Sequence, residues 1–170
     1  MYGYSTSAVF AYRFALLHPE IVEAVFAGGV GGAIPIPLSE YKGENLIYPV
    51  GTSDLENIID SKFNEEAYRK VKQFYFMGSE EKKVMNNGIE HYNIPKFTSL
   101  YDEDVGSLTC RVLGEDMYDR MNKLNEIYIE NGYDNITLKI YEGFGHVQEP
   151  SFSDMYKFYS EYLEKSNLSS

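Results

Sequence analysis

The sequence of 170 residues has no tryptophan, a single cysteine, few basic residues and no long apolar run. Cys110 alone can form neither an internal disulfide nor a zinc site of several cysteines. It fits a reduced, cytoplasmic compartment, although secreted proteins can also have one cysteine. Lys and Arg number 15 against 26 Asp and Glu, so the net charge of −11 leaves no basic surface for nucleic acid. We therefore expect no nucleic-acid partner and, because no apolar stretch approaches the roughly 18 residues of a spanning helix, no membrane segment.

Short β-rich runs alternate with helical patterns along the chain. Strands are predicted at residues 21–27, 72–77 and 136–141, because these runs are rich in β-branched and aromatic residues and end at glycines. Helices are predicted at residues 7–17, 64–70 and 115–131 and after Ser151. Residues 30–62 and about 79–107 are predicted to be irregular. This order predicts one α/β domain over residues 1–170, with a parallel sheet of about three strands flanked by helices.

The start of the chain places a serine between small residues, in Gly3-Tyr4-Ser5-Thr6-Ser7, directly before the first predicted helix. A serine on a sharp turn from strand to helix has an exposed hydroxyl, and the next backbone N–H, that of Thr6, points toward a developing oxyanion. The pentapeptide alone favours a simpler interpretation, a helix N-cap, because Ser7 replaces the usual second glycine and serine often caps helices. Ser5 is therefore a candidate nucleophile that needs a base to support it.

A candidate base follows the last predicted strand. His146 ends a Gly-Phe-Gly-His loop, whose glycines let the chain bend so that the imidazole reaches over the edge of the sheet. A serine nucleophile needs such a base within hydrogen-bond reach of its hydroxyl. An ordinary surface histidine is the alternative. His18 precedes a proline at the end of a helix and His91 lies in a polar segment, so neither is a comparable candidate.

The acid that orients the base is expected after the strand at residues 72–77. Glu80 and Glu81 follow that strand, and the chain order serine, acid, histidine is that of enzymes with this kind of serine turn. Glu81 is the preferred candidate and Glu80 stays open. Plain surface ion pairs with Lys82 and Lys83 are the alternative.

Together these residues resemble the C-terminal half of an α/β-hydrolase, and the chain is similar to bacterial serine esterase-like members of that family. The resemblance is carried by the Gly-Tyr-Ser-x-Ser turn, by "FALLHPE", "VEAV" and "FYFMGSEE", and by the Gly-x-Gly-His ending, and it extends over nearly the whole chain. It implies a serine hydrolase of carboxylic esters, with Ser5 as nucleophile, Glu81 as acid, His146 as base and the Thr6 N–H as first oxyanion donor. It implies no cofactor and no metal. The family usually has aspartate at the position of Glu81, and glutamate serves in some relatives.

The family also has about five strands before the serine turn, and these strands contribute the second oxyanion donor. The resemblance therefore implies that the N-terminal strands are absent, that the chain begins inside the strand leading to Ser5, and that an unpaired sheet edge allows self-association. With one oxyanion donor, hydrolysis is expected to be weak. One alternative is a truncated, catalytically inactive remnant that retains the triad residues. Another is a non-enzymatic binding module that uses the aromatic segment between Tyr41 and Tyr48.

Overall fold

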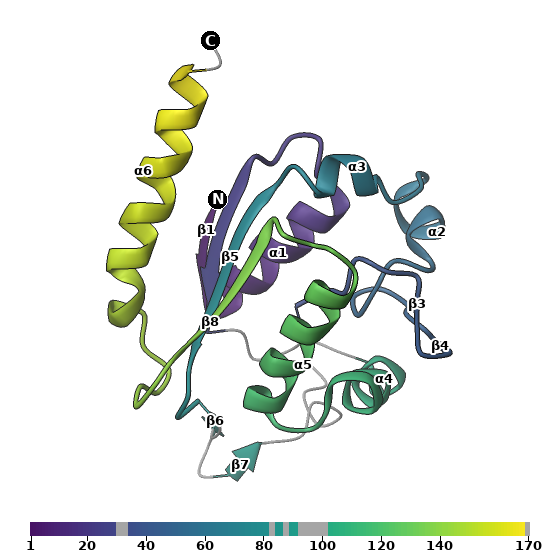
Figure 1. The fold of residues 1–170 in the computed structure, drawn as a ribbon. Coiled ribbons are helices and arrows are strands. Elements are labelled where there is room, and N and C mark those ends of the chain that lie inside the picture. The colour runs from purple at the N-terminus through teal and green to yellow at the C-terminus, as the bar shows by residue number, and fades with distance from the viewer. Residues whose placement is uncertain (30–33, 82–83, 87–88, 92–101, 169–170) are drawn as a thin grey trace.

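The computed structural model describes residues 1–29, 34–81, 84–86, 89–91 and 102–168 (Figure 1). Its main sheet has four parallel strands in the order β1-β2-β5-β8. These strands are Tyr2–Tyr4, Ala24–Gly28, Lys72–Gly78 and Ile136–Tyr141. Helix α6 (Phe152–Leu168) covers one face of the sheet, and α1 (Thr6–Leu17) and α5 (Met117–Glu130) cover the other. The chain is therefore an α/β domain with helices on both faces of a parallel sheet.

The predicted α/β class with a parallel sheet is confirmed, but the predicted count of three strands is wrong. The three predicted strands are present as β2, β5 and β8, and a fourth strand, β1, pairs in parallel with β2 at the edge of the sheet. A strand of three residues is too short for an alternating pattern to be recognised. The sharp turn expected at the serine, between strand and helix, consists of Ser5 alone, because Gly3 and Tyr4 belong to β1 and α1 begins at Thr6.

The other elements agree with the predictions unevenly. Helix α1 ends before His18 as expected, and Asn64 caps the next predicted helix by accepting a hydrogen bond from Ala67 N–H at 3.0 Å. The predictions of irregular structure over residues 30–62 and about 79–107 are wrong in part. Two short strands and a short helix lie in the first stretch and two short strands in the second, and Asp102 occupies the N-cap position of a helix that begins at Glu103 with acidic residues in its first turn. The remaining elements are β3 (Glu40–Tyr41), β4 (Glu44–Asn45), α2 (Leu55–Ile59), α3 (Glu65–Tyr68), β6 (Val84–Asn86), β7 (Ile89–His91), α4 (Glu103–Leu113) and η2 (Glu149–Ser151). In the described part of the chain no helix has both the length and the apolar character to cross a membrane.

The two faces of the sheet have cores of different composition. The face under α1 and α5 buries mainly aliphatic side chains and the fully buried rings of Tyr12, Tyr75 and Tyr128. The face under α6 has a smaller, aromatic cluster. Its members are Ala24, Phe26, Phe76 and Phe158, with Tyr4, Phe74, Tyr141, Met155, Tyr159 and Tyr162 packed against them. All five residues of β2 are buried, as expected for a strand covered on both faces. The aromatic cluster thus extends from α6 to the end of β1, beside Ser5.

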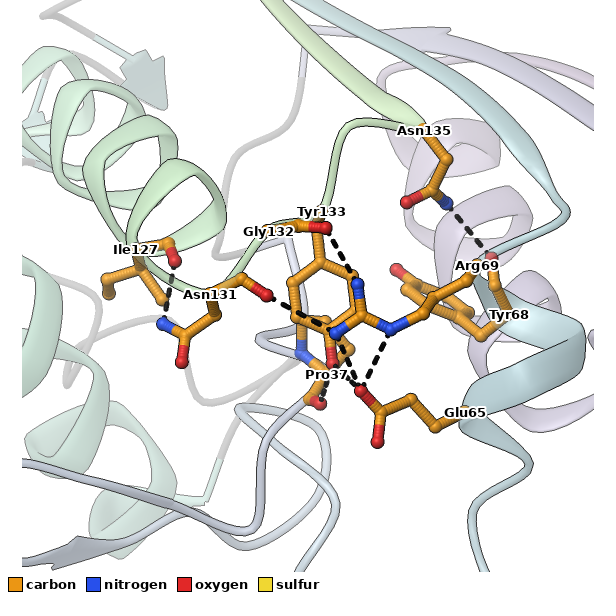
Figure 2. Close-up of polar contacts among 9 residues, drawn as sticks. All are labelled: Pro37, Glu65, Tyr68, Arg69, Ile127, Asn131, Gly132, Tyr133 and Asn135. Carbon is orange, nitrogen blue, oxygen red and sulfur yellow. Dashed lines mark hydrogen bonds and ion pairs between the residues drawn. The ribbon is translucent and has the colours of Figure 1, made fainter.

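A polar network joins α3 to the loop between α5 and β8 (Figure 2). The guanidinium of Arg69 donates to the backbone oxygens of Gly132 and Asn131 at 2.7 and 3.2 Å. It also bonds Glu65 at 2.8 Å and lies 4.0 Å from the ring centre of Tyr133. The hydroxyl of Tyr133 donates to Glu65 as well, at 2.9 Å, and these bonds lower the pKa of that carboxyl. The network fixes the chain just before β8 and so helps to set where that strand starts.

Candidate active site

The carboxyl ends of the four parallel strands lie together at the lower end of the sheet in Figure 1. This end, where the strands stop, is the sheet edge that bears the candidate site; it differs from the outer edge formed by β1. The register pairs Tyr4 with Gly28, Gly28 with Phe76, and Gly78 with Tyr141, so β1, β2, β5 and β8 end almost level with one another. Side chains in the segments that follow these strands are therefore near neighbours. Such an edge is where open α/β sheets bind ligands.

Ser5 follows β1 in a strained turn. Its backbone has φ 58° and ψ −124°, a conformation that residues other than glycine rarely adopt and that is concentrated at functional sites. The Ser5 N–H still donates to Gly28 O at 2.9 Å, so the turn remains bound to β2. Although Ser5 occupies the N-cap position of α1, its side chain makes no capping hydrogen bond. The simpler interpretation of the serine, as a cap, therefore lacks the hydrogen bond that it requires.

Ser7 bonds the strand end instead. Its hydroxyl accepts from Tyr4 N–H and donates to Tyr4 O, both at 2.8 Å. Gly3 allows this close approach of strand and helix, because a Cβ there would lie 2.5 Å from Ser7 O and 2.8 Å from Ala8 Cα. The backbone N–H of Thr6, the first residue of α1, is among the helix N-terminal donors that have no partner inside the helix. This turn can therefore present both the Ser5 hydroxyl and a backbone donor.

Glu81 and His146 come together beyond the ends of β5 and β8. The carboxylate of Glu81 lies 3.0 Å from His146 Nδ1 through Oε2, and its Oε1 accepts from Gly78 N–H at 2.8 Å. The Glu81 side chain is 1% exposed and that of His146 is 46% exposed. With Nδ1 as the donor to Glu81, Nε2 of His146 is the nitrogen that can accept a proton. Glu80, the other candidate acid, is exposed and, among the described residues, makes no hydrogen bond to His146.

The hydrogen bond to Glu81 also sets the protonation of His146. It raises the pKa of the imidazole above its ordinary value of 6.5, and the negative charge of Glu81 acts in the same direction, whereas partial burial opposes both effects. The direction of this shift favours the protonated imidazole, the form that a carboxylate partner stabilises.

The loop that bears His146 is held against the end of β5. Ser79 N–H donates to Tyr141 O at 3.0 Å, Glu80 N–H donates to Phe144 O at 2.8 Å, and Gly143 N–H donates to Ser79 Oγ at 2.9 Å. A Cβ on Gly78 would lie 2.1 Å from Phe144 O, so only glycine fits at the end of β5. Glu81 and His146 thus lie on two segments that are hydrogen-bonded to each other.

Ser5 and His146 both lie next to the end of β2. Ser5 bonds Gly28, while the Cε1 of His146 lies 2.8 Å from the position a Cβ would take on Gly29, which has φ +64°. Between these two described residues there is no hydrogen bond, and contacts of this kind are often loose in unliganded enzymes. Their convergence to hydrogen-bonding distance therefore stays a prediction.

The other histidines lie elsewhere. His18 is at the opposite end of α1 from Ser5 and pairs with Glu20 at 3.6 Å, and His91 lies in β7. Among the residues that the structure describes, no group of three or more His, Cys, Asp or Glu is placed to hold a metal ion. Two features of the site were not anticipated: the bond between Ser7 and the end of β1, and the contact of the Tyr4 ring with His146, whose centroids are 4.9 Å apart. The pentapeptide contained both residues, but no local pattern indicates where a side chain two residues from a turn will bond.

Comparison of the chain with protein-family models, with curated proteins and with solved structures found no match in any of the three.

Proposed function

We propose that this chain is a serine hydrolase of the α/β-hydrolase type that acts on carboxylic esters through Ser5, His146 and Glu81. The observation that carries the proposal is the buried Glu81 carboxylate bonded to His146 Nδ1 at 3.0 Å, at the same sheet edge as a serine in a strained turn. A buried acid that orients a partly exposed imidazole is the arrangement that serine nucleophiles require. A surface histidine would not need a partner that is 1% exposed.

The proposed reaction uses each group once in each half. His146 Nε2 takes the proton of the Ser5 hydroxyl as the oxygen attacks the ester carbonyl carbon, and Glu81 stabilises the imidazolium that forms. The Thr6 N–H donates to the carbonyl oxygen as it becomes negative. Collapse of this intermediate breaks the ester C–O bond, and the imidazolium gives its proton to the departing alcohol. Water then attacks the acyl-serine carbonyl carbon as His146 Nε2 takes one of its protons. The bond from that carbon to the serine oxygen breaks, the imidazolium returns the proton to the Ser5 oxygen, and the carboxylic acid leaves.

A fluorophosphonate probe tests the proposal, because it forms a covalent bond only with an activated serine. We expect labelling of the wild-type chain at Ser5, mapped by peptide mass spectrometry, and loss of labelling in Ser5→Ala. Ser61→Ala is the control, since Ser61 is exposed and lies before α3, away from the turn that bears Ser5, and it should still be labelled. Labelling that persists in Ser5→Ala, or its absence from the wild-type chain, would favour the alternative of an inactive remnant or a binding domain.

Two further parts of the proposal concern the surroundings of the protein. Because Ser5 N–H points to β2, the N–H and C=O of Tyr4 point to the outer side of β1, where the Ser7 hydroxyl already bonds both. We propose self-association through the outer edge of β1. The Ser7 hydroxyl occupies the N–H and C=O of Tyr4, so fewer backbone groups of this edge are open to another strand. A cytoplasmic location, which the single cysteine favours, is likewise a proposal. Neither affects the chemistry above.

A further inference from the structure

The imidazole of His146 makes one hydrogen bond to the described residues, through Nδ1, and much of its remaining surface is exposed to solvent. Its Nδ1 bonds Glu81, and the side chain is 46% exposed. A single hydrogen bond fixes the position of Nδ1 but leaves the ring able to rotate about that contact. A base that must receive a proton from one particular hydroxyl needs its ring plane to be fixed as well. A second contact is therefore required to hold the imidazole.

The ring of Tyr4 makes that second contact. The centroids of the Tyr4 and His146 rings are 4.9 Å apart, with 33° between their planes. Both rings also meet at Gly29, where an added Cβ would lie 2.8 Å from Tyr4 Cε2 and 2.8 Å from His146 Cε1. The absence of a side chain at Gly29 thus leaves the space in which the two rings touch. Tyr4 is the residue immediately before Ser5, so the same short segment contacts the base and bears the candidate nucleophile.

The Tyr4 ring is itself held in place by the aromatic cluster under α6. It stacks on Phe76, with centroids 6.2 Å apart and 18° between the planes, and Phe76 is 1% exposed. Phe76 in turn packs against Phe26 and Tyr141, at 5.4 and 5.9 Å between centroids. The ring that His146 rests on is therefore continuous with a buried part of the core.

The ring of Tyr4 makes defined contacts, whereas its hydroxyl makes no hydrogen bond to any residue that the structure describes. The hydroxyl is also buried. Burial and the negative charges of Glu81 and Glu149 raise the pKa of Tyr4 to about 12, so the ring is uncharged where it touches the imidazole. A buried hydroxyl without a partner does not help folding. What the site uses at this position is the aromatic face.

We propose that Tyr4 is a positioning residue, whose ring fixes the plane of the His146 imidazole while Glu81 fixes its Nδ1. This inference deepens the proposed function and rests on it as far as catalysis is concerned. The positioning itself is a physical property of the folded chain, and it can be measured without any reaction.

Nuclear magnetic resonance of the histidine Cε1–H groups tests whether Tyr4 positions His146, separately from whether the chain catalyses a reaction. In the wild-type chain we expect a ring-current displacement of the His146 Cε1–H resonance and a nuclear Overhauser contact between it and the Tyr4 ring protons. The displacement should persist in Tyr4→Phe, which retains the ring, and disappear in Tyr4→Leu. Phe74→Leu is the matched control, because it removes another ring from the same cluster, and it should leave the displacement unchanged. Absence of the Overhauser contact in the wild-type chain would overturn the inference even if Tyr4→Leu failed to fold.

The rate of fluorophosphonate labelling at Ser5 gives the catalytic readout. We expect Tyr4→Leu to lower the second-order rate constant by about tenfold, since small misplacements of a reacting group can cost up to about a hundredfold. Tyr4→Phe and Phe74→Leu should stay within about twofold of the wild-type rate. Equal losses in Tyr4→Leu and Phe74→Leu would mean that the ring has only a structural role and would overturn the inference. If no variant and no wild-type chain is labelled, the proposed function fails, and the resonance data still decide whether Tyr4 positions His146.

Discussion

Ser5→Ala is expected to lower kcat/KM for p-nitrophenyl acetate by about 10³-fold or more, the largest effect of any single substitution in this chain. A complete serine triad contributes about 10⁶-fold to kcat. The Thr6 N–H is the backbone donor proposed for the oxyanion, and a site that works with a single donor is slower by about 10²- to 10³-fold. Even then, an effect of about 10³-fold or more depends on the Ser5 hydroxyl and disappears with it. Initial rates at fixed enzyme concentration measure the change.

Ser61→Ala is the control for this substitution, because Ser61 is exposed and lies before α3, away from the sheet edge that bears Ser5. It should hydrolyse the ester at the wild-type rate. Equal rates for Ser5→Ala and the wild-type chain would mean that other nucleophiles on the protein produce the observed hydrolysis.

Glu81→Gln is expected to lower kcat by at least about 100-fold with little change in KM. The amide of glutamine can still accept from Gly78 N–H, so the turn after β5 should remain folded. It cannot stabilise an imidazolium, and it allows the wrong tautomer of His146, which in serine proteases costs about 10⁴-fold. Glu80→Gln removes the same charge from the adjacent, exposed residue and should have kinetics close to wild type. If Glu80→Gln is the variant that loses activity, the acid has been assigned to the wrong residue.

The same pair of variants gives a pH dependence with a defined sign. His146 acts as a base only when neutral, so kcat/KM rises with pH through the pKa of its imidazole. Because the bond to Glu81 raises that pKa above 6.5, the midpoint of the wild-type profile should lie above 6.5. In Glu81→Gln both the hydrogen bond and the charge effect are lost, and the midpoint should move to lower pH. A midpoint that does not move would mean that Glu81 does not set the protonation of the base.

The sequence was informative about the fold where its patterns are long. Strands β2, β5 and β8 have five to seven residues and are rich in β-branched and aromatic side chains, and the parallel α/β class followed from their alternation with helices. Strand β1 was expected only from the resemblance, which places the start of the chain inside the strand before Ser5; its three residues contain no period that could predict a strand. Helix α4 was missed although Val105, Leu108 and Leu113 have helical spacing; Gly106 inside the helix, a poor helix former, weakens the pattern.

The sequence also pointed to the residues that the structure places at one sheet edge, although it could not supply their contacts. The order along the chain put Ser5, Glu81 and His146 after different strands, and parallel strands bring such positions together. Glu80 and Glu81 are adjacent residues of the same type, so the sequence alone could not decide between them. The structure separates them by burial, since the Glu81 side chain is 1% exposed, and by the bond to His146. The contact of Tyr4 with that imidazole depends on Gly29, which lies 25 residues away in sequence, and no local pattern reports it.

The central claim is that His146 activates Ser5, and the rate of covalent labelling tests it most directly. The second-order rate constant for fluorophosphonate labelling of Ser5 should fall by at least about 100-fold in His146→Gln, because a general base contributes roughly 10²- to 10⁴-fold. His146 is 46% exposed, so the variant should retain its fold, which amide resonance dispersion can check. His18→Gln, a change at the far end of α1, should be labelled at the wild-type rate. Equal labelling rates for His146→Gln and the wild-type chain would contradict the account, since Ser5 would then react without its base.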